Sequence, residues 1–463
     1  MKTVLPITKT FIILICILEV VINSSCTTII TYPVPPGLQT SPDIELTVNN
    51  KSVWVERVAS RLDTFDYSIG LYGGRKMEDM DVASFSFEGK IKIKISASEK
   101  IENYLIRPKS RKIEAEVNNN EISFYIDSPQ KLYIEINNFP HLAIFADAPE
   151  VNPLREGDQG ITYFGPGEHK TSEIELKNDQ TVYIAAGAIV YADITGKDLK
   201  NVTIRGRGML QGNVRISGTH NLNVSDIFVR NTKGWTNTLT DCHHSSYRNV
   251  KVFGYEGIWG LDGINPVSSK NFTIDNCFMR CRDDCIAIKS MNPDLSIDSI
   301  SVTNCVMVGW SCSDGVTLGF ELNGGPVQNV MVKNCDILYA RGGGRTNGHA
   351  GFSIVCDGPA IVQNILFEDI RIEEQVEFKN LELIVTDGTL YGNDPPGHIQ
   401  NVMMKNINWE NPGKPFVISG FSSENMVENI IFQGCTVGGK PIRSIADADF
   451  RINEFTGNIV FLP

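Results

Sequence analysis

Residues 270–281 read KNFTIDNCFMRC. Two polar residues come first, then a run in which apolar and polar residues alternate, then an Asn-Cys pair and a second short apolar run. Similar stretches begin at residues 200, 220, 248, 298, 328, 363, 400 and 428. Alternation with a period of two predicts β-strands. Recurrence every 20 to 37 residues, about one unit per turn, predicts a solenoid, because one such unit cannot bury its own apolar face.

The repeats contain no helical periodicity, so we interpret residues 151–463 as a right-handed parallel β-helix. An asparagine followed by a cysteine recurs at one register of the repeat, and stacked asparagine side chains can hydrogen-bond along the axis. Stacked cysteines are expected to pack as small apolar residues, since their spacing fits neither a zinc site nor an established pairing. The recurring pairs are Asn276-Cys277, Asn304-Cys305 and Asn334-Cys335.

Residues 26–150 have a different pattern. Short alternating runs such as KIKIKISAS, EISFYID and KLYIEINN are separated at roughly ten-residue intervals by Asn, Gly, Pro and Ser. This spacing is typical of antiparallel strands with one wet face, so we predict a small antiparallel β-sandwich. Pro149 and Pro153 lie in a linker between the two predicted domains.

The first 25 residues resemble an export signal. Lys2 and Lys9 precede an apolar run over residues 11–22, and small polar residues follow. We interpret residues 1–25 as a signal peptide, which makes the protein secreted, periplasmic or displayed at the cell surface. Cys26 stands where a bacterial lipoprotein signal has its lipidated cysteine, so a lipid anchor to a bacterial membrane stays an alternative to simple cleavage.

The net charge of the chain limits the kinds of partner that it can bind. The formal net charge is -12 and the sequence pI is about 5.2. Binding to nucleic acid depends on clustered Lys and Arg, so we expect no nucleic-acid partner. We expect a monomer without a cofactor.

Four aspartates stand out within the repeats. Asp262, the adjacent pair Asp283 and Asp284, and Asp314 all precede the same strand of successive units. Equivalent positions of stacked coils lie about 4.8 Å apart, so these carboxyl groups are expected to form one acidic patch. Neighbouring carboxyls that push each other's pKa values apart supply the acid and the base that cleavage of a glycosidic bond requires. Turn-capping aspartates and a calcium site are the alternatives.

The motifs around these aspartates carry a family resemblance. DG at 262–263, DDCIAIKS at 283–290 and SDGVTLG at 313–319 resemble the polygalacturonase-type glycoside hydrolases of family 28 and the wider pectin-lyase-like superfamily. The likeness covers roughly residues 155–460.

The resemblance implies an enzyme that hydrolyses a pectin-related or other polysaccharide or oligosaccharide. It implies that Asp283 is the general acid and that Asp262 and Asp284 hold and activate the attacking water. It further implies a single displacement with inversion and without a metal. The residues by themselves predict only the carboxyl cluster.

The chain departs from the family pattern at three places. Residues 260–262 are Gly-Leu-Asp where the family usually has Asn-Thr-Asp, and residues 313–315 are Ser-Asp-Gly where it has Gly-His-Gly. The Arg-Ile-Lys motif, whose cations grip a galacturonate carboxylate, aligns with Ser-Ile-Val at 353–355. A carboxylate needs a cationic or multiply hydrogen-bonded partner, so these changes argue against plain polygalacturonate as the substrate.

Further candidates lie near the carboxyl cluster. Asp314 is expected to shape the site or tune its pKa values, and Lys289 to contact substrate or neutralise the acidic patch. Tryptophans near the bends offer apolar faces for a pyranose, although core packing is the commoner fate of a single tryptophan. Basic side chains in the loop ARGGGRTNGHAG offer replacements for the missing cations. These candidates are Trp235, Trp259, Trp310, Arg341, Arg345 and His349.

Two other functions fit the same pattern. A β-helix also supports calcium-dependent β-elimination, and an acidic patch could hold calcium, so a polysaccharide lyase is the first rival. A solenoid that binds glycans without cleaving them is the second, because one fold supports many chemistries.

Overall fold

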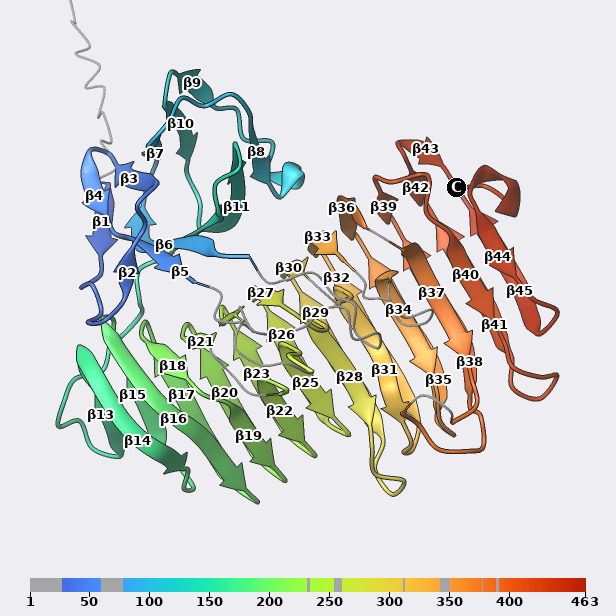
Figure 1. Ribbon diagram of the computed structural model, residues 1–463. Coiled ribbons are helices and arrows are strands. Elements are labelled where there is room, and N and C mark those ends of the chain that lie inside the picture. Colours follow the sequence, from blue (N-terminus) through green and yellow to red (C-terminus); the bar gives the residue numbers. More distant parts are fainter. Residues whose placement is uncertain are drawn as a thin grey trace, which may run out of the picture.

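Figure 1 shows a computed structural model of the chain, in which a smaller β domain sits on one side of a long stack of strands. The structure describes residues 27–59, 78–230, 234–253, 260–310, 313–341, 350–376, 378–388 and 391–463.

The predicted signal peptide and Cys26 lie outside these ranges. Within them, none of the helices has the length and the hydropathy that crossing a bilayer requires. The described helices are two short 3-10 turns, η1 (Lys109–Arg111) and η2 (Ile445–Asp447).

The smaller domain consists of two facing sheets that enclose an apolar core. Its seven-stranded sheet contains β1 (Thr28–Thr31), β2 (Gln39–Thr40), β5 (Val55–Val58), β6 (Met80–Glu88), β8 (Tyr104–Arg107), β11 (Gln130–Ile136) and β12 (His141–Asp147). Its five-stranded sheet contains β3 (Ile44–Val48), β4 (Lys51–Val53), β7 (Ile91–Ala97), β9 (Glu116–Asn118) and β10 (Glu121–Ile126).

One strand pair corrects the expectation of a wholly antiparallel sandwich. β6 and β12 run parallel, with Met80 opposite His141 and Ser86 opposite Asp147. Alternation within each strand, which carried the prediction, is the same for parallel and antiparallel neighbours, so the sequence pattern could not distinguish them.

The rest of the chain winds into a parallel β-helix (Figure 1). Each full coil has one strand in a twelve-stranded sheet and two in a 21-stranded sheet that bends at a corner. We call the two halves of the bent sheet the first ladder and the second ladder.

The twelve-stranded sheet contains β13 (Ile161–Phe164), β15 (Thr181–Ile184), β17 (Lys200–Gly206), β20 (His220–Ser225), β23 (His243–Arg248), β26 (Lys270–Asp275), β29 (Ile297–Thr303), β32 (Val327–Lys333), β35 (Ile361–Glu368), β38 (His398–Lys405), β41 (Val427–Gln433) and β45 (Thr456–Leu462). The first ladder contains β18 (Met209–Gln211), β21 (Phe228–Arg230), β24 (Lys251–Phe253), β27 (Phe278–Cys281), β30 (Val306–Gly309), β33 (Asp336–Ala340), β36 (Arg371–Val376), β39 (Asn408–Trp409) and β42 (Thr436–Val437). The second ladder contains β19 (Val214–Ser217), β22 (Asn237–Thr240), β25 (Ile264–Val267), β28 (Ile286–Ser290), β31 (Val316–Leu322), β34 (Ala350–Cys356), β37 (Lys379–Val385), β40 (Phe416–Ser419) and β44 (Phe450–Ile452). The bent sheet also includes β14 (Gly167–Glu175), β16 (Ala188–Lys197) and β43 (Lys440–Pro441).

The repeated asparagines have a backbone role that the sequence pattern did not reveal. At the turn from the twelve-stranded sheet into the first ladder, one residue adopts a left-handed conformation in eight coils, and Asn, Asp and Gly tolerate this conformation best. Side-chain bonds add to this, since Asn334 Nδ2 donates to Asn304 Oδ1 at 2.7 Å. The left-handed residues are Asp226, Asn249, Asn276, Asn304, Asn334, Asp369, Asn406 and Gly434.

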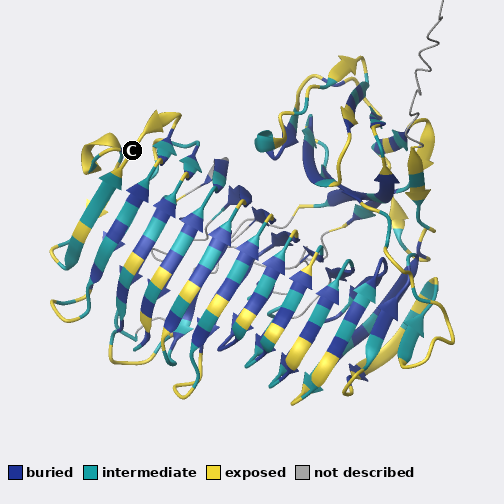
Figure 2. Cartoon of the chain, turned by 180° about the vertical axis from the view of Figure 1, so that it is seen from behind, coloured by how far each residue is buried: buried dark blue, intermediate teal, exposed yellow. Residues whose placement is uncertain are grey.

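Where a cysteine follows this turn, its side chain points into the core, as predicted. Cys277, Cys305 and Cys335 are fully buried thiols, and in other coils isoleucine or valine fills the same position. Figure 2 shows the alternation along the strands of the twelve-stranded sheet, where buried residues alternate with intermediate or exposed ones.

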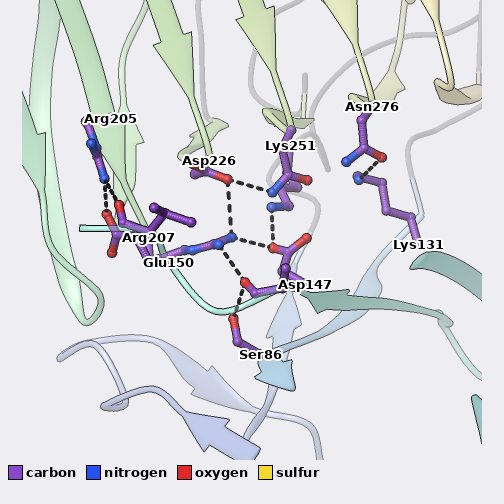
Figure 3. Close-up of polar contacts among 12 residues, drawn as sticks. Ser86, Lys131, Asp147, Glu150, Arg205, Arg207, Asp226, Lys251 and Asn276 are labelled. Carbon is purple, nitrogen blue, oxygen red and sulfur yellow. Dashed lines mark hydrogen bonds and ion pairs between the residues drawn. The ribbon is translucent and has the colours of Figure 1, made fainter. Parts of the chain in front are cut away.

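The smaller domain covers part of the first ladder. Tyr133 and Phe145 pack against Phe278 and other apolar side chains of β21, β24, β27, β30 and β33. Buried ion pairs between side chains also connect the two domains. Figure 3 shows Asp147 between two basic side chains of the β-helix. Its Oδ2 accepts from Lys251 Nζ at 2.6 Å and from Arg207 Nη1 at 2.8 Å. Removing one partner of such a buried pair would leave an uncompensated charge at the contact between the domains.

We predict that Asn304→Val lowers the free energy of unfolding by about 1–3 kcal/mol, because φ is 57° at this position and a β-branched residue strains there. Asn304→Gly is the matched control, since glycine keeps the conformation while losing the side-chain bonds. Chemical unfolding monitored by circular dichroism measures both variants. Equal losses for the two would show that the side-chain bonds, and not the backbone conformation, set the cost.

Candidate active site

The four aspartates occupy the corner between the first and second ladders. Asp262 precedes β25, Asp283 and Asp284 precede β28, and Asp314 precedes β31. Backbone hydrogen bonds hold these bends in register, because Gly263 N donates to Asp284 O at 2.8 Å and Cys285 N donates to Asp314 O at 3.1 Å. The stacking therefore places carboxyl groups 52 residues apart in sequence on three adjacent coils.

Direct hydrogen bonds link Asp283, Asp284 and Asp314, and Asp262 is close enough for its charge to act on Asp284. Asp284 Oδ1 accepts from the backbone N of Asp314 at 3.0 Å, and Asp283 Oδ1 accepts from the backbone N of Asp284 at 3.2 Å. Asp262 Oδ2 accepts from Asn265 Nδ2 at 2.6 Å. The structure thus brings together the four carboxyls as the sequence predicted, whereas their catalytic roles stay predictions.

Burial makes it costly for all of these groups to ionise. Asp262, Asp284 and Asp314 are buried, and Asp283 is half-buried. Burial, followed by the charge of Asp283, raises the pKa of Asp262 to about 7. Burial and then the charges of Asp314, Asp283 and Asp262 raise the pKa of Asp284 well above its usual range. Several protons therefore stay in the cluster near neutral pH.

Hydrogen bonds from neighbouring residues occupy both carboxyl oxygens of Asp314. Its Oδ1 accepts from Ala350 N at 2.7 Å, and its Oδ2 accepts from Thr317 Oγ1 at 3.2 Å and from Ser353 Oγ. Burial outweighs these bonds and raises its pKa to about 8. Because both oxygens already have donors and the residue is fully buried, the geometry favours a role in shaping the cluster over contact with substrate.

Lys289 is a buried cation next to the carboxyl cluster. Its Nζ lies 2.8 Å from Glu321 Oε2 and 3.8 Å from Asp262 Oδ2, and 4.7 Å from the centre of the Trp235 ring. Burial opposes its charge, but the carboxylates of Glu321 and Asp262 outweigh burial and raise its pKa. Lys289 thus partly neutralises the cluster, which is one of its two predicted roles.

Three partners of the site were missed or undervalued by sequence reasoning. Glu321, Asn265 and Ser353 each bond a member of the cluster or its lysine. A polar or charged residue inside an otherwise apolar strand was the available signal in each case. Ser353 occupies the place of the expected arginine, and its hydroxyl binds Asp314 instead of presenting a cation.

The expectation that Trp310 offers a sugar-binding face is wrong. The side chain is 1% exposed and lies between the two domains. Its ring centre is 5.3 Å from that of His141 in the smaller domain, and the guanidinium groups of Arg280 and Arg341 lie 4.6 Å and 4.1 Å from it. Burial against a second domain is not visible in the repeat pattern.

Other predicted residues fall in different places. Arg341 is half-buried and packs over Trp310 and, at 4.7 Å, over Tyr339. Trp259, Arg345 and His349 lie outside the described residues. Trp235, on the bend before β22, is half-buried beside Lys289 and is the described tryptophan nearest the cluster's lysine.

Among the described ranges, no group of three or more His, Cys, Asp or Glu side chains is arranged to hold a metal ion.

Fold and site together define a parallel β-helix protein with an acid–base cluster at one row of bends. Comparison with known families gives the particular assignment. Residues 197–447, more than half of the chain, match glycosyl hydrolases family 28, and the chain belongs to that family. The resemblance seen in the motifs is thereby confirmed.

Individual relatives are distant. A polygalacturonase of Arabidopsis thaliana, QRT2, is 28% identical over 151 residues, which are 33% of this chain and 32% of that protein. A probable endo-xylogalacturonan hydrolase of Aspergillus fumigatus is 22% identical over 214 residues, 43% of this chain and 49% of that protein. The chain thus spans about a third to a half of the length of the curated relatives it matches.

Among solved structures, a hyperthermoactive exopolygalacturonase from Thermotoga maritima superposes with a TM-score of 0.51 at 16% identity. The match covers 65% of this chain and 84% of the other, and it supports the β-helix fold.

We predict that Asp262→Asn flattens the dependence of stability on pH. In an unfolded chain these carboxyls ionise near pH 4, whereas folding holds the pKa of Asp262 at about 7 and that of Asp314 at about 8. The native state binds more protons between these limits, so stability falls as the pH rises from about 4 to about 8. Removing one ionisable group should reduce this fall by about 1–3 kcal/mol.

Urea unfolding at pH 5 and pH 8 measures the effect. Asp294→Asn, at an exposed aspartate outside the cluster, is the control and should keep the wild-type slope. A wild-type protein that gains stability over this pH range would contradict the assigned pKa directions.

Proposed function

We propose that the chain is a glycoside hydrolase that cleaves a polysaccharide or oligosaccharide through its carboxyl cluster. The observation that carries the proposal is the gathering of four carboxyls in which Asp283 alone is half-buried, while Asp262, Asp284 and Asp314 are buried. A group that protonates a glycosidic oxygen must reach the substrate, and Asp283 has the accessible carboxyl.

Asp283 is the general acid in this mechanism. It gives its proton to the leaving oxygen while a water attacks the anomeric carbon from the opposite face. Asp262 and Asp284 hold that water and take its proton, and the bond to the leaving group breaks in the same displacement with inversion. The cluster regains its starting state when the base releases the proton taken from the water to solvent and Asp283 takes up a new one.

The pKa shifts apply to the carboxyl cluster as a whole and do not by themselves divide its members into acid and base. Burial and the neighbouring carboxylates raise the pKa of Asp262 and of Asp284, so one of the two must lose its proton before it can take a proton from the water. The ammonium of Lys289, 3.8 Å from Asp262 Oδ2, stabilises one carboxylate as the base form. Asp314 holds the bend through its backbone bond to Asp284.

The substrate we propose is pectin-related but is not plain polygalacturonate at the cleavage site. Ser353 and Val355 stand where the family motif has two cations, and the first binds Asp314 while the second joins an apolar cluster with Phe320 and Ile384. Lys289 is already paired with Glu321. The described part of the site therefore favours a neutral or esterified sugar at the bond that is cleaved.

We also propose that residues 1–25 direct export and that the mature protein meets its glycan outside the cytoplasm. Mass spectrometry of the mature N-terminus distinguishes simple cleavage from a lipidated Cys26.

Asp283→Asn is expected to lower kcat by about 10²–10⁴, because the amide cannot donate the catalytic proton. Sugar release from a panel of uronic and neutral polysaccharides, with chelator present, measures the loss. Asp294→Asn is the control and should keep wild-type activity. Proton NMR of the first product should show the inverted anomer.

The rival functions give different results in the same assay. An unsaturated, ultraviolet-absorbing product that disappears with chelator would identify a calcium-dependent lyase. Binding of a glycan without turnover by the wild type would identify a binding solenoid. Unchanged activity in a folded Asp283→Asn protein would overturn the assigned acid.

A further inference from the structure

The five-stranded sheet of the smaller domain has an outer face that the mechanism does not use. The opposite, seven-stranded sheet is the one that packs against the β-helix, through residues of β5, β6, β11 and β12. Along β7, Ile91, Ile93 and Ile95 enter the sandwich core, so Lys92 and Lys94 project from the outer face. This sheet lies on the side of the domain away from the β-helix (Figure 1).

The outer face contains a hollow of about 370 Å³. It lies between the cross-strand neighbours of β3, β7 and β10 and the turn that joins β3 to β4. Its lining offers one aromatic ring, two ammonium groups, two amides and a hydroxyl, and it includes no carboxylate. The lining residues are Thr47, Asn49, Asn50, Lys92, Lys94 and Tyr125.

Tyr125 supplies the aromatic ring of this hollow. Its side chain is 57% exposed, which is high for a large aromatic residue on a sheet. Lys90 Nζ and Lys92 Nζ lie 5.0 Å and 5.6 Å from the centre of its ring. Neither ammonium forms an ion pair with a carboxylate of the described residues, whereas Lys94 pairs with Glu121 at 2.8 Å.

These groups match one class of ligand. An exposed aromatic ring packs against the apolar face of a pyranose, and the amides can bond its hydroxyls. The two ammonium groups lie over the ring, so a stacking sugar displaces at least one of them, and both attract carboxylates on the same sugar chain. In a chain of net charge -12, unpaired lysines around an exposed tyrosine form a local site for an anion.

We propose that this face is a second, non-catalytic binding site for a polysaccharide that carries uronate carboxylates. Tyr125 stacks on the sugar ring, and Lys90 and Lys92 pair with its carboxylates. The site holds the polymer while the carboxyl cluster of the β-helix acts elsewhere on it. The proposal takes from the proposed function only that the protein meets glycans.

Binding of polygalacturonate tests the proposal, with highly methyl-esterified pectin as a ligand of the same backbone and few charges. The full chain carrying Asp283→Asn prevents turnover, and the dissociation constant is measured by isothermal titration calorimetry. Tyr125→Ala should raise it at least tenfold, and so should Lys90→Ala combined with Lys92→Ala. Methyl-esterified pectin should bind more weakly than polygalacturonate.

Matched controls lie in the same domain. Tyr104→Ala removes a tyrosine that is 40% exposed on the other sheet, and Lys100→Ala removes an exposed lysine that is paired with Glu102. Both should leave binding unchanged. Equal losses for Tyr125→Ala and Tyr104→Ala, or equal binding of both pectins, would overturn the proposal. Equal binding of heparin would also overturn it, because it would show unspecific attraction of polyanions.

Hydrolysis provides a separate readout. Tyr125→Ala in the otherwise wild-type chain should keep its rate on short oligosaccharides and lose rate on the long polymer at low concentration. Absence of any hydrolysis would refute the proposed function, while the binding comparison would still decide the second site. A loss of rate on short oligosaccharides would place Tyr125 in the catalytic machinery and overturn its assignment to a distant site.

Discussion

Every coil of the β-helix must return to the same register as the coil below it, since its strands are satisfied only by the backbone of their neighbours. The left-handed residue at the turn into the first ladder makes this return geometrically feasible, and Asn, Asp or Gly therefore occupies it in eight coils. Once that turn is fixed, the following corner is fixed too. The carboxyl cluster depends on this constraint, because Asp262, Asp284 and Asp314 meet only if three corners stack.

Burying several carboxyl groups side by side costs electrostatic free energy of folding. Burial and like charges raise the pKa of Asp284 and of Asp262, so the native state prefers them protonated. Backbone N–H groups and Lys289 offset part of the repulsion without neutralising it. A fold that was optimised for stability alone would replace such groups with apolar side chains. Retaining them is consistent with acid–base chemistry at this corner.

Much of this arrangement was predictable from the sequence. Period-two alternation together with recurring Asn-Cys pairs identified the solenoid, and the shared register of Asp262, Asp283 and Asp314 identified the cluster. Contacts of the β-helix with the smaller domain, and the pairing of individual polar side chains between coils, were not predictable. The burial of Trp310 depends on His141 in the other domain, and the partner of Lys289 is Glu321, which lies one coil further along. Repeat periodicity describes neighbours within the stack and contains no information about what covers it.

The smaller domain also restrains the corners that carry the carboxyl cluster. Trp310 directly follows β30 and lies four residues before Asp314, and Arg280 in β27 lies three residues before Asp283. Both side chains contact the smaller domain, Trp310 through His141 and Arg280 through a 3.0 Å bond from its Nε to Tyr133 Oη. Packing on the first ladder therefore restrains two successive corners from their outer side, while backbone ladders restrain them from within. Because carboxyl groups that share protons are sensitive to small changes in separation, restraint from both sides keeps their pKa values far from the usual range. The sandwich thus contributes to the geometry of the carboxyl cluster, although none of its described residues has a proposed catalytic role.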